Sequence, residues 1–233
     1  MAEPASAVSP NEMVMQFILD LFHVRVRRLT ESLILVSDPT WDDVARLSRA
    51  SIYPGVEEVT TSYSTLGIYG RPEPGWEDWI TRAVTEIEDY PPPQVHEIPV
   101  CYEMGEDLAS VGSSLGLTEA EVVELHIGAQ YQCFAVGFQP GFAYLGPLPI
   151  QLTGLERRST PRTRVESGSV GICQDQTAVY PNASPGGWHL IGCCPVELVN
   201  VVENYFPIQA GDVIRFRPID NQEFEKLRCQ RLT

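Results

Sequence analysis

Short runs of alternating hydrophobic and polar residues fill the first third of the chain and predict strands. Four such runs cover residues 22–28, 32–37, 56–61 and 65–69. Two stretches with apolar residues at helical spacing, 41–52 and 76–88, predict helices. This order favours a small ferredoxin-like α+β domain over residues 21–90. Residues 1–20 begin rich in Ala, Ser and Pro and are expected to form a disordered tail.

The run Tyr90-Pro91-Pro92-Pro93 predicts the boundary between two domains, because consecutive prolines exclude both helix and central strand. The second domain, 94–233, is expected to begin with a strand over 95–102. Helices over 107–115 and 118–129 follow, and Thr118 with Glu121 forms a capping box at the start of the second.

Beyond these helices, short apolar or β-branched runs alternate with Gly and Pro every few residues as far as Pro195. A further strand is expected over 213–217, and residues 223–231 suit a short helix or a strand cap. Short strands joined by tight turns predict a compact β domain with two helices.

The formal charge of −15 arises from 16 basic and 31 acidic residues. This field repels phosphate backbones and acidic membrane surfaces, so nucleic-acid binding and membrane attachment are not expected. No signal peptide is recognised, and the six cysteines have no metal-type spacing. The expectation is therefore a cytoplasmic protein with reduced thiols and no metal site.

Four arginines, Arg157, Arg158, Arg162 and Arg164, fall close together in this acidic chain. Guanidinium groups bind carboxylate or phosphate through paired hydrogen bonds. The cluster predicts an anion site; the alternative is pairing with neighbouring carboxylates such as Glu166. Because Arg162 and Arg164 are two residues apart, a strand would place them on one face.

Aromatic residues beside Gly or Pro turns, Tyr144, Tyr180 and Trp188, can wall a ligand pocket, although a place in the core suits Trp188 better. His126, near the end of a helix, can donate or accept a proton, although a lone helical His is more often structural. Neither a nucleophile elbow nor a phosphate-binding Gly-rich loop is present. We therefore expect the chain to supply one wall of a shared site.

Several sequence blocks in fixed order carry a family resemblance. They are Ile98-Pro99-Val100-Cys101-Tyr102, Gly137-Phe138-Gln139-Pro140-Gly141-Phe142-Ala143-Tyr144-Leu145, Thr160-Pro161-Arg162-Thr163-Arg164-Val165, Gly168-Ser169-Val170-Gly171-Ile172, Ser184-Pro185-Gly186-Gly187-Trp188 and Ala210-Gly211-Asp212-Val213-Ile214-Arg215-Phe216. Together they resemble the carboxyltransferase C/D-domain family, also called allophanate hydrolase subunit 1. That family includes the B-type subunit of 5-oxoprolinase and a bacterial histidine-kinase inhibitor.

The resemblance implies a cyclophilin-like β-barrel for residues 94–233 and a partner subunit with a carboxyltransferase A/B domain. It implies ATP-dependent hydrolysis of a small amide or lactam, such as 5-oxoproline to glutamate, or a urea-carboxylase-type carboxyl transfer. ATP is expected in the complex, without an assigned site on this chain. Both reactions develop negative charge on a carbonyl oxygen, which Arg162 and the Gly168-Ser169 backbone are suited to stabilise.

The resulting hypothesis assigns Arg162 and His126 as catalytic residues. The expected substrate-binding residues are Pro140, Gly141, Phe142, Tyr144, Arg158, Arg164, Gly168, Ser169, Tyr180, Gly186 and Gly187.

Departures from the family pattern favour an alternative. Glu166 stands where the family commonly has Pro, and Cys193-Cys194 stands where it commonly has Arg-Thr. No partner domain is recognised within the sequence. The alternative function is a regulatory module that binds and inhibits a protein such as a histidine kinase. Peptidyl-prolyl isomerisation ranks below both, because it rests on fold analogy alone.

Overall fold

The computed structural model describes residues 25–30, 32–37, 55–62, 65–71, 75 and 92–232. The chain divides into two compact units, Met1–Pro92 and Pro93–Thr233. The expected tail over 1–20 and the expected helices over 41–52 and 76–88 lie outside the described residues.

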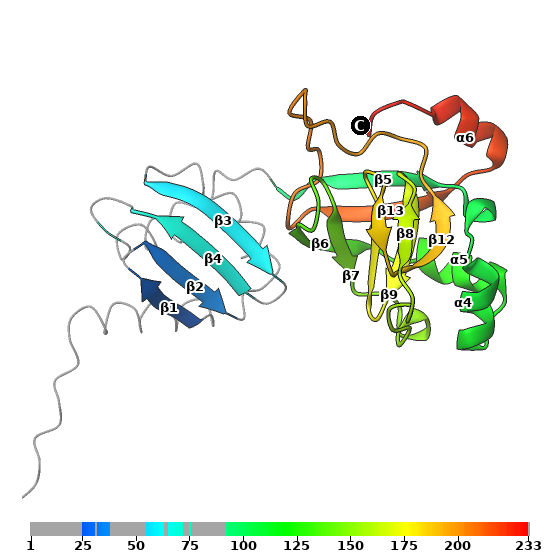
Figure 1. Ribbon diagram of the computed structural model, residues 1–233, viewed down its shortest axis with the longest axis horizontal. Coiled ribbons are helices and arrows are strands. Elements are labelled where there is room, and N and C mark those ends of the chain that lie inside the picture. Colours follow the sequence, from blue (N-terminus) through cyan, green and yellow to red (C-terminus); the bar gives the residue numbers. More distant parts are fainter. Residues whose placement is uncertain are drawn as a thin grey trace, which may run out of the picture. The chain divides into compact units, whose positions relative to one another are not determined.

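The first unit contains a four-stranded antiparallel sheet in the order β1-β2-β4-β3 (Figure 1). Its strands are β1 (Arg25–Thr30), β2 (Leu33–Ser37), β3 (Val56–Ser62) and β4 (Thr65–Gly70). Alternate residues of β2 and β4 are buried, as the period-two pattern predicts. However, β1 and β2 form a hairpin, whereas a ferredoxin-like unit places a helix between its first two strands. The ferredoxin-like prediction is therefore not confirmed.

The second unit holds most of the described secondary structure. Its strands are β5 (Val95–Val100), β6 (Tyr131–Val136), β7 (Ala143–Gly146), β8 (Arg162–Val165), β9 (Ser169–Cys173), β10 (Gln176–Val179), β11 (Ser184–Gly186), β12 (His189–Cys193) and β13 (Val213–Pro218). Its helices are η3 (Tyr102–Met104), α4 (Leu108–Leu115), α5 (Glu119–Ile127), η4 (Ile150–Leu152) and α6 (Asn221–Leu227).

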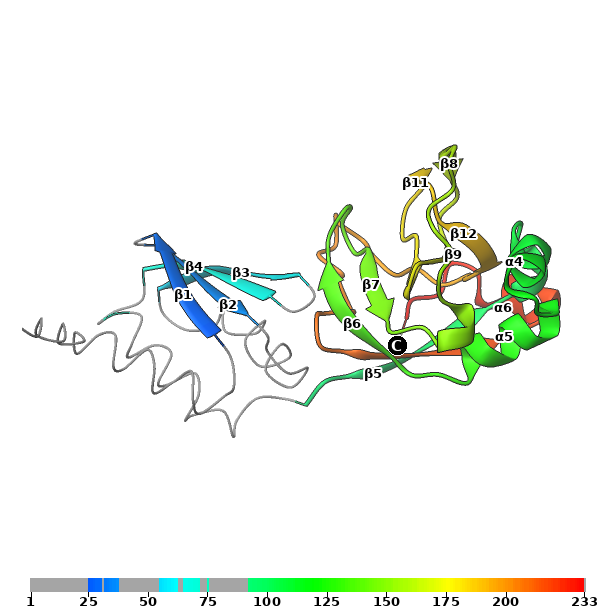
Figure 2. The same ribbon diagram turned by 90° about the horizontal axis from the view of Figure 1, so that it is seen from below.

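Seven of these strands form one sheet in the order β12-β9-β10-β7-β6-β13-β5. The pair β13–β5 is parallel and the other neighbours are antiparallel. The two edge strands meet where Cys101, directly after β5, forms an antiparallel bridge with Cys193 at the end of β12. The sheet is therefore a nearly closed β-barrel, as Figures 1 and 2 show.

Helices α4 and α5 lie together at one end of the barrel (Figure 2). Thr118 Oγ1 accepts from Glu121 N at 3.2 Å, and Glu121 Oε2 accepts from Thr118 N at 2.7 Å, which confirms the capping box. Helix α4 ends at Gly116, whose φ of 71° suits a residue without a Cβ.

Strands β8 and β11 pair with each other as a separate two-stranded sheet, with Arg162 opposite Gly186. Figure 2 shows this ribbon standing out from the barrel strands. The ribbon carries Arg162 and Arg164, two of the four clustered arginines, and its Gly186 lies against the Tyr180 ring.

Candidate functional site

Asp107, directly before α4, anchors the arginine cluster. Its carboxylate accepts from Arg162 Nη2 at 2.8 and 2.9 Å and from Arg158 Nη1 at 3.0 Å. It also accepts from the backbone N–H of Leu190 at 2.7 Å. One buried carboxylate therefore ties the segment around β8 to both α4 and β12 and brings Arg162 and Arg158 together, while the expected anion site at these arginines stays a prediction.

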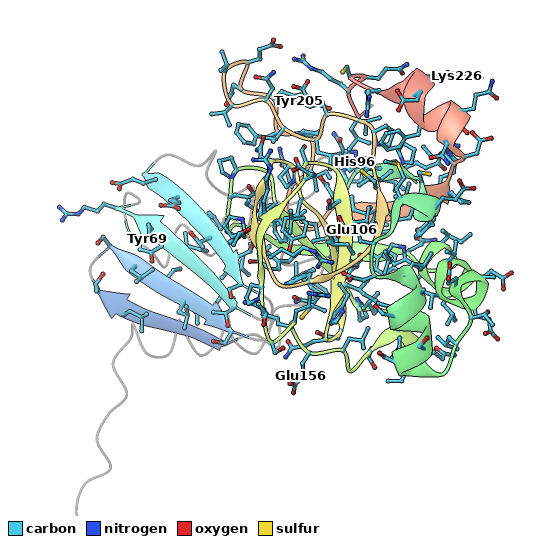
Figure 3. All side chains as sticks on the ribbon, turned by 45° about the vertical axis from the view of Figure 1, so that its right-hand side comes forward. Tyr69, His96, Glu106, Glu156, Tyr205 and Lys226 are labelled. Atoms are coloured by element: carbon cyan, nitrogen blue, oxygen red, sulfur yellow. The ribbon has the colours of Figure 1, made fainter. Side chains whose placement is uncertain are left out.

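The neighbouring guanidinium charges keep the Asp107 carboxylate ionised. Burial alone raises the pKa of Asp107, but the hydrogen bonds from Arg162 and Leu190 and the two guanidinium charges outweigh burial, so the pKa is lowered. Glu106 adds a second carboxylate 3.3 Å from Arg162 Nη2 (labelled in Figure 3). Both arginines are thus held by carboxylates of the same chain.

Two guanidinium nitrogens of this cluster stay available. Arg158 Nε and Arg162 Nη1 are buried and find no hydrogen-bond acceptor among the described residues. A buried donor without an acceptor destabilises the folded state. Such a donor therefore indicates either local strain or an acceptor supplied by a ligand. The Arg158 backbone N–H bonds Gly187 O at 2.8 Å, which places Gly187 beside the cluster.

An aromatic cluster packs against the β8–β11 ribbon at Gly186. The Phe142 ring makes edge contacts with Tyr144, Tyr180 and Trp188, with centroids 4.9, 5.3 and 5.7 Å apart. Gly186 lies against Tyr180 so closely that a Cβ would come 2.5 Å from the phenol oxygen. Tyr144 is half-buried and the other three rings are buried. The cluster therefore positions the ribbon and offers Tyr144 to a ligand.

The turn between β6 and β7 carries two more of the expected residues. Gly141 has a φ of 76° and lies against Val199, whose side chain a Cβ would approach to 2.7 Å. Pro140 is exposed at the same turn, and Gln139 Nε2 reaches Ser184 Oγ at 3.4 Å. This turn therefore lies beside β11, next to the aromatic cluster.

His126 lies apart from the arginines, in the barrel core. Its ring is fully buried, with Nδ1 2.6 Å from Tyr102 Oη and Nε2 2.9 Å from Thr177 Oγ1. It stacks on Phe216 at 4.4 Å. Because both nitrogens are occupied and no part of the ring is exposed, the geometry supports a structural role and gives no path for contact with a substrate.

The burial of His126 predicts an acid-sensitive fold. Desolvation lowers its pKa to about 3, so the folded state leaves the ring neutral at pH values where the unfolded chain, with a pKa of about 6.5, protonates it. The contribution of His126 is therefore complete above the unfolded pKa. This contribution to the free energy of unfolding falls by about 1.4 kcal/mol for each pH unit below the unfolded-state pKa. Urea unfolding should show a loss from this group of roughly 2–3 kcal/mol between about pH 6.5 and 4.5.

The matched control is the His126→Gln variant, which lacks the titrating ring but still contains every acidic residue. Between about pH 6.5 and 4.5, the free energy of unfolding of this variant should fall by roughly 2–3 kcal/mol less than that of the wild type. Equal pH dependence in the two proteins would contradict this account of His126.

Gly168 and Ser169, expected to offer backbone donors, pair with backbone groups of the same chain. The Gly168 N–H donates to Tyr180 O at 2.7 Å, and Gly168 O accepts from Cys194 N at 2.7 Å. Ser169 N donates to Glu166 O at 3.2 Å. These backbone N–H groups are therefore already used in the fold, and their role as charge stabilisers stays a prediction.

Substituting Gly168 should be costly. Its φ is 86°, and a Cβ would lie 2.2 Å from Cys194 O, so Gly168→Ala should lower the free energy of unfolding by about 3 kcal/mol or more. Gly154→Ala is the matched control, because Gly154 has a φ of 90° but no atom within 4 Å of its Cβ position. That control should cost only the left-handed strain, about 1–2 kcal/mol. Thermal unfolding of both variants tests the difference, and equal losses would contradict it.

Arg164 lies two residues from Arg162 but has a different partner. Its side chain is 67% exposed and bonds Glu166 at 2.6 and 3.1 Å. The arrangement follows the alternative expectation for the cluster, pairing with a neighbouring carboxylate. Arg164 therefore stands outside the group that Asp107 holds together.

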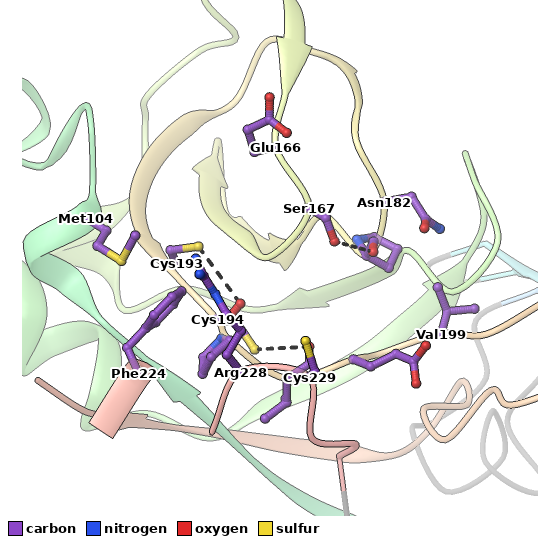
Figure 4. Close-up of a pocket in the computed structure, with 14 residues that line it drawn as sticks. Met104, Glu166, Ser167, Asn182, Cys193, Cys194, Val199, Phe224, Arg228 and Cys229 are labelled. Atoms are coloured by element: carbon purple, nitrogen blue, oxygen red, sulfur yellow. Dashed lines mark hydrogen bonds between the residues drawn. The ribbon is translucent and has the colours of Figure 1, made fainter. Parts of the chain in front are cut away.

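An open pocket of about 510 Å³ lies beside Glu166 and Ser167, the two residues before Gly168 (Figure 4). Glu166 and Cys193-Cys194, the positions that depart from the family pattern, line it together with Ser167 and Arg228. Glu166 and Cys193-Cys194 therefore line the same cavity, although they are far apart in the sequence.

Asp107, the common partner of Arg158 and Arg162, is not among the site residues expected from the sequence. Its place before α4 indicated only a helix start, and nothing local signals a contact with a residue 55 positions away. Among the described residues, no group of three or more His, Cys, Asp or Glu is placed to hold a metal. No helix in the described part of the chain has the length and apolar character needed to span a bilayer.

Comparison with known proteins identifies the family to which this chain belongs. The model of the carboxyltransferase domain, subdomain C and D, matches residues 30–206, and the chain belongs to this family. It is 49% identical over 125 residues to the B-type 5-oxoprolinase subunit of Escherichia coli O157:H7, and 40% identical over 134 residues to that of Bacillus subtilis. These matches cover 52% and 56% of this chain and only 57% and 55% of the relatives.

Solved structures are similar over more of the chain. A conserved uncharacterized protein of Pyrococcus horikoshii is 31% identical, with a TM-score of 0.52, over 85% of this chain and 99% of that one. The protein TTHA0988 is 30% identical with a TM-score of 0.66, over 84% of this chain but 40% of that one. The Kluyveromyces lactis urea amidolyase, 17% identical with a TM-score of 0.60 over 90% of this chain and 16% of that one, shares the fold.

Proposed function

We propose that this chain is the B-type subunit of an ATP-dependent hydrolase of the 5-oxoprolinase kind, which opens the lactam of 5-oxoproline to glutamate. The observation that carries the proposal is the 40–49% identity to B-type subunits of 5-oxoprolinase. The match to the carboxyltransferase family model supports it. The proposed partner is a subunit with a carboxyltransferase A/B domain. ATP enters as a substrate of the complex, and no residue of this chain is assigned to it.

The geometry supports the β8–β11 ribbon as this chain's wall of the shared site. Opening a lactam places negative charge on the carbonyl oxygen, and an already oriented guanidinium stabilises that charge without reorganisation. Arg162 and Arg158 are oriented by Asp107, and each keeps a donor without an acceptor among the described residues. The half-buried Tyr144 ring packs edge-on against Phe142 and Trp188.

The remaining expected residues divide into three groups around this wall. Phe142, Tyr180, Gly186 and Gly187 shape the ribbon, while Pro140 and Gly141 form the adjoining turn. Gly168, Ser169 and Arg164 flank Glu166 and Ser167 in the sequence, and these two residues line the pocket of Figure 4. His126 stabilises the barrel core. In this proposal the ribbon contacts the substrate and the partner chain completes the enclosure.

Reconstitution tests the function. The chain, mixed with an A/B-domain subunit from the same source, should release phosphate from ATP only when 5-oxoproline is present, with glutamate formed in equal amount. Either chain alone should show no turnover. A stable complex that hydrolyses neither 5-oxoproline nor another small amide would overturn the proposal and favour the regulatory binding module.

A further inference from the structure

The seam that closes the barrel consists of two facing cysteines. Cys101 N donates to Cys193 O at 2.8 Å, and Cys193 N donates to Cys101 O at 3.0 Å. Residues that exchange both hydrogen bonds in an antiparallel pair have Cα atoms about 5.5 Å apart and side chains on one face. That spacing lies within the range disulfides require, about 4.4–6.8 Å.

Both side chains point to the same side of the seam. Cys101 and Cys193 pack with Ile219 and Phe224 in one cluster beside α6. Both thiols are free. Cys101 Sγ contacts Asn221 Oδ1 at 3.5 Å, and Cys193 Sγ contacts Cys194 O at 3.9 Å, so these contacts hold neither sulfur strongly.

The pocket gives one of the two sulfurs access to solvent. Cys193 is only partly buried and lines the cavity of about 510 Å³, whereas Cys101 is fully buried and is not among the residues that line it. A small oxidant in the pocket therefore reacts with Cys193 first. Cys101 can then attack the oxidised Cys193 sulfur.

We propose that Cys101 and Cys193 form a reversible disulfide that closes the barrel covalently, with a small-molecule disulfide such as oxidised glutathione as the oxidant. The Cys193 thiolate attacks one glutathione sulfur, the glutathione S–S bond breaks, and one reduced glutathione leaves. The Cys101 thiolate then attacks Cys193 Sγ in the mixed disulfide and releases the second glutathione. The two cysteines lose two electrons and two protons in total, which the two glutathione molecules take up.

The geometry predicts a bond that is easily reduced. Cβ atoms of directly opposite residues lie about 4.5–5.5 Å apart, towards the long end when both hydrogen bonds are made, whereas a disulfide prefers about 3.8 Å. The bond therefore draws β5 and β12 together under strain, and strained disulfides are the labile ones. Burial raises the pKa of both thiols, that of Cys193 to about 11, so the reaction takes minutes to hours.

The test uses the full chain, incubated with millimolar oxidised glutathione and then alkylated under denaturing conditions. Intact mass should show six alkylated thiols before oxidation and four after it, with dithiothreitol restoring six. Chymotryptic peptides of the oxidised protein should contain Cys101 linked to the segment bearing Cys193. This measurement needs no variant.

Matched variants separate this pair from the other thiols of the pocket. Cys194→Ser and Cys229→Ser, which change the two other cysteines lining the pocket, should still lose two thiols. Cys101→Ala and Cys193→Ser should not form the linked peptide. Retention of all six thiols in the wild type, stable glutathionylation alone, or a bond mapped to Cys194 or Cys229 would each overturn the proposal.

Discussion

Replacing Arg162 with Gln should lower the kcat of the reconstituted complex by about 100- to 1000-fold, the usual effect of removing one donor to a developing oxyanion. Arg162 is held by Asp107 at 2.8 and 2.9 Å and retains Nη1 for a ligand. Gln keeps a polar side chain but loses both the charge and the paired geometry. The measurement is 5-oxoproline-dependent phosphate release at saturating substrate.

Arg164→Gln is the matched control, since it removes the same charge from the same strand. Its partner is Glu166 on the exposed side, so kcat should stay within about twofold of the wild type. Both variants should be assayed well below their unfolding temperatures, so that a loss of folded protein does not imitate a loss of catalysis. Equal activities in the two variants would contradict the assignment of Arg162 to the site.

Replacing Asp107 with Asn should lower the free energy of unfolding by about 2–4 kcal/mol. Asp107 has a side chain only 7% exposed and compensates Arg162, which is 18% exposed, and Arg158, which is 37% exposed. Without the carboxylate charge, Arg158 loses its acidic partner and Arg162 keeps only the exposed Glu106. Urea denaturation of the two proteins measures the difference.

Asp175→Asn serves as the control for Asp107, because Asp175 is exposed and its substitution should change stability by less than about 0.5 kcal/mol. The double variant Asp107→Asn, Arg162→Gln should lose less than the sum of the single losses, since the two side chains share one interaction. Additive losses would show that Asp107 and Arg162 do not stabilise each other.

Local patterns predicted much of the secondary structure. The alternation in residues 32–37 and 65–69 matches β2 and β4, because one face of a half-buried strand is apolar. The capping box at Thr118 is correct because it depends on residues three apart. Boundaries were less accurate: α5 ends at Ile127 rather than Ala129, and β1 extends to Thr30 rather than Arg28.

The site depended on contacts that no local pattern contains. The cluster of Arg158 and Arg162 was visible in the sequence, but its anchor, Asp107, lies more than 50 positions away. His126 was a candidate proton carrier because of its residue type. Its burial depends on Thr177, 51 positions later, and on packing against β13. Tertiary packing therefore decided which polar residues are accessible.

The most direct test of the central claim is a crystal structure of the reconstituted complex with 5-oxoproline bound. The account predicts the lactam carbonyl oxygen within about 3 Å of a guanidinium nitrogen of Arg162 or Arg158, with the partner chain covering the opposite side. A substrate enclosed entirely by the partner chain, with no atom in contact with the β8–β11 ribbon, would contradict it.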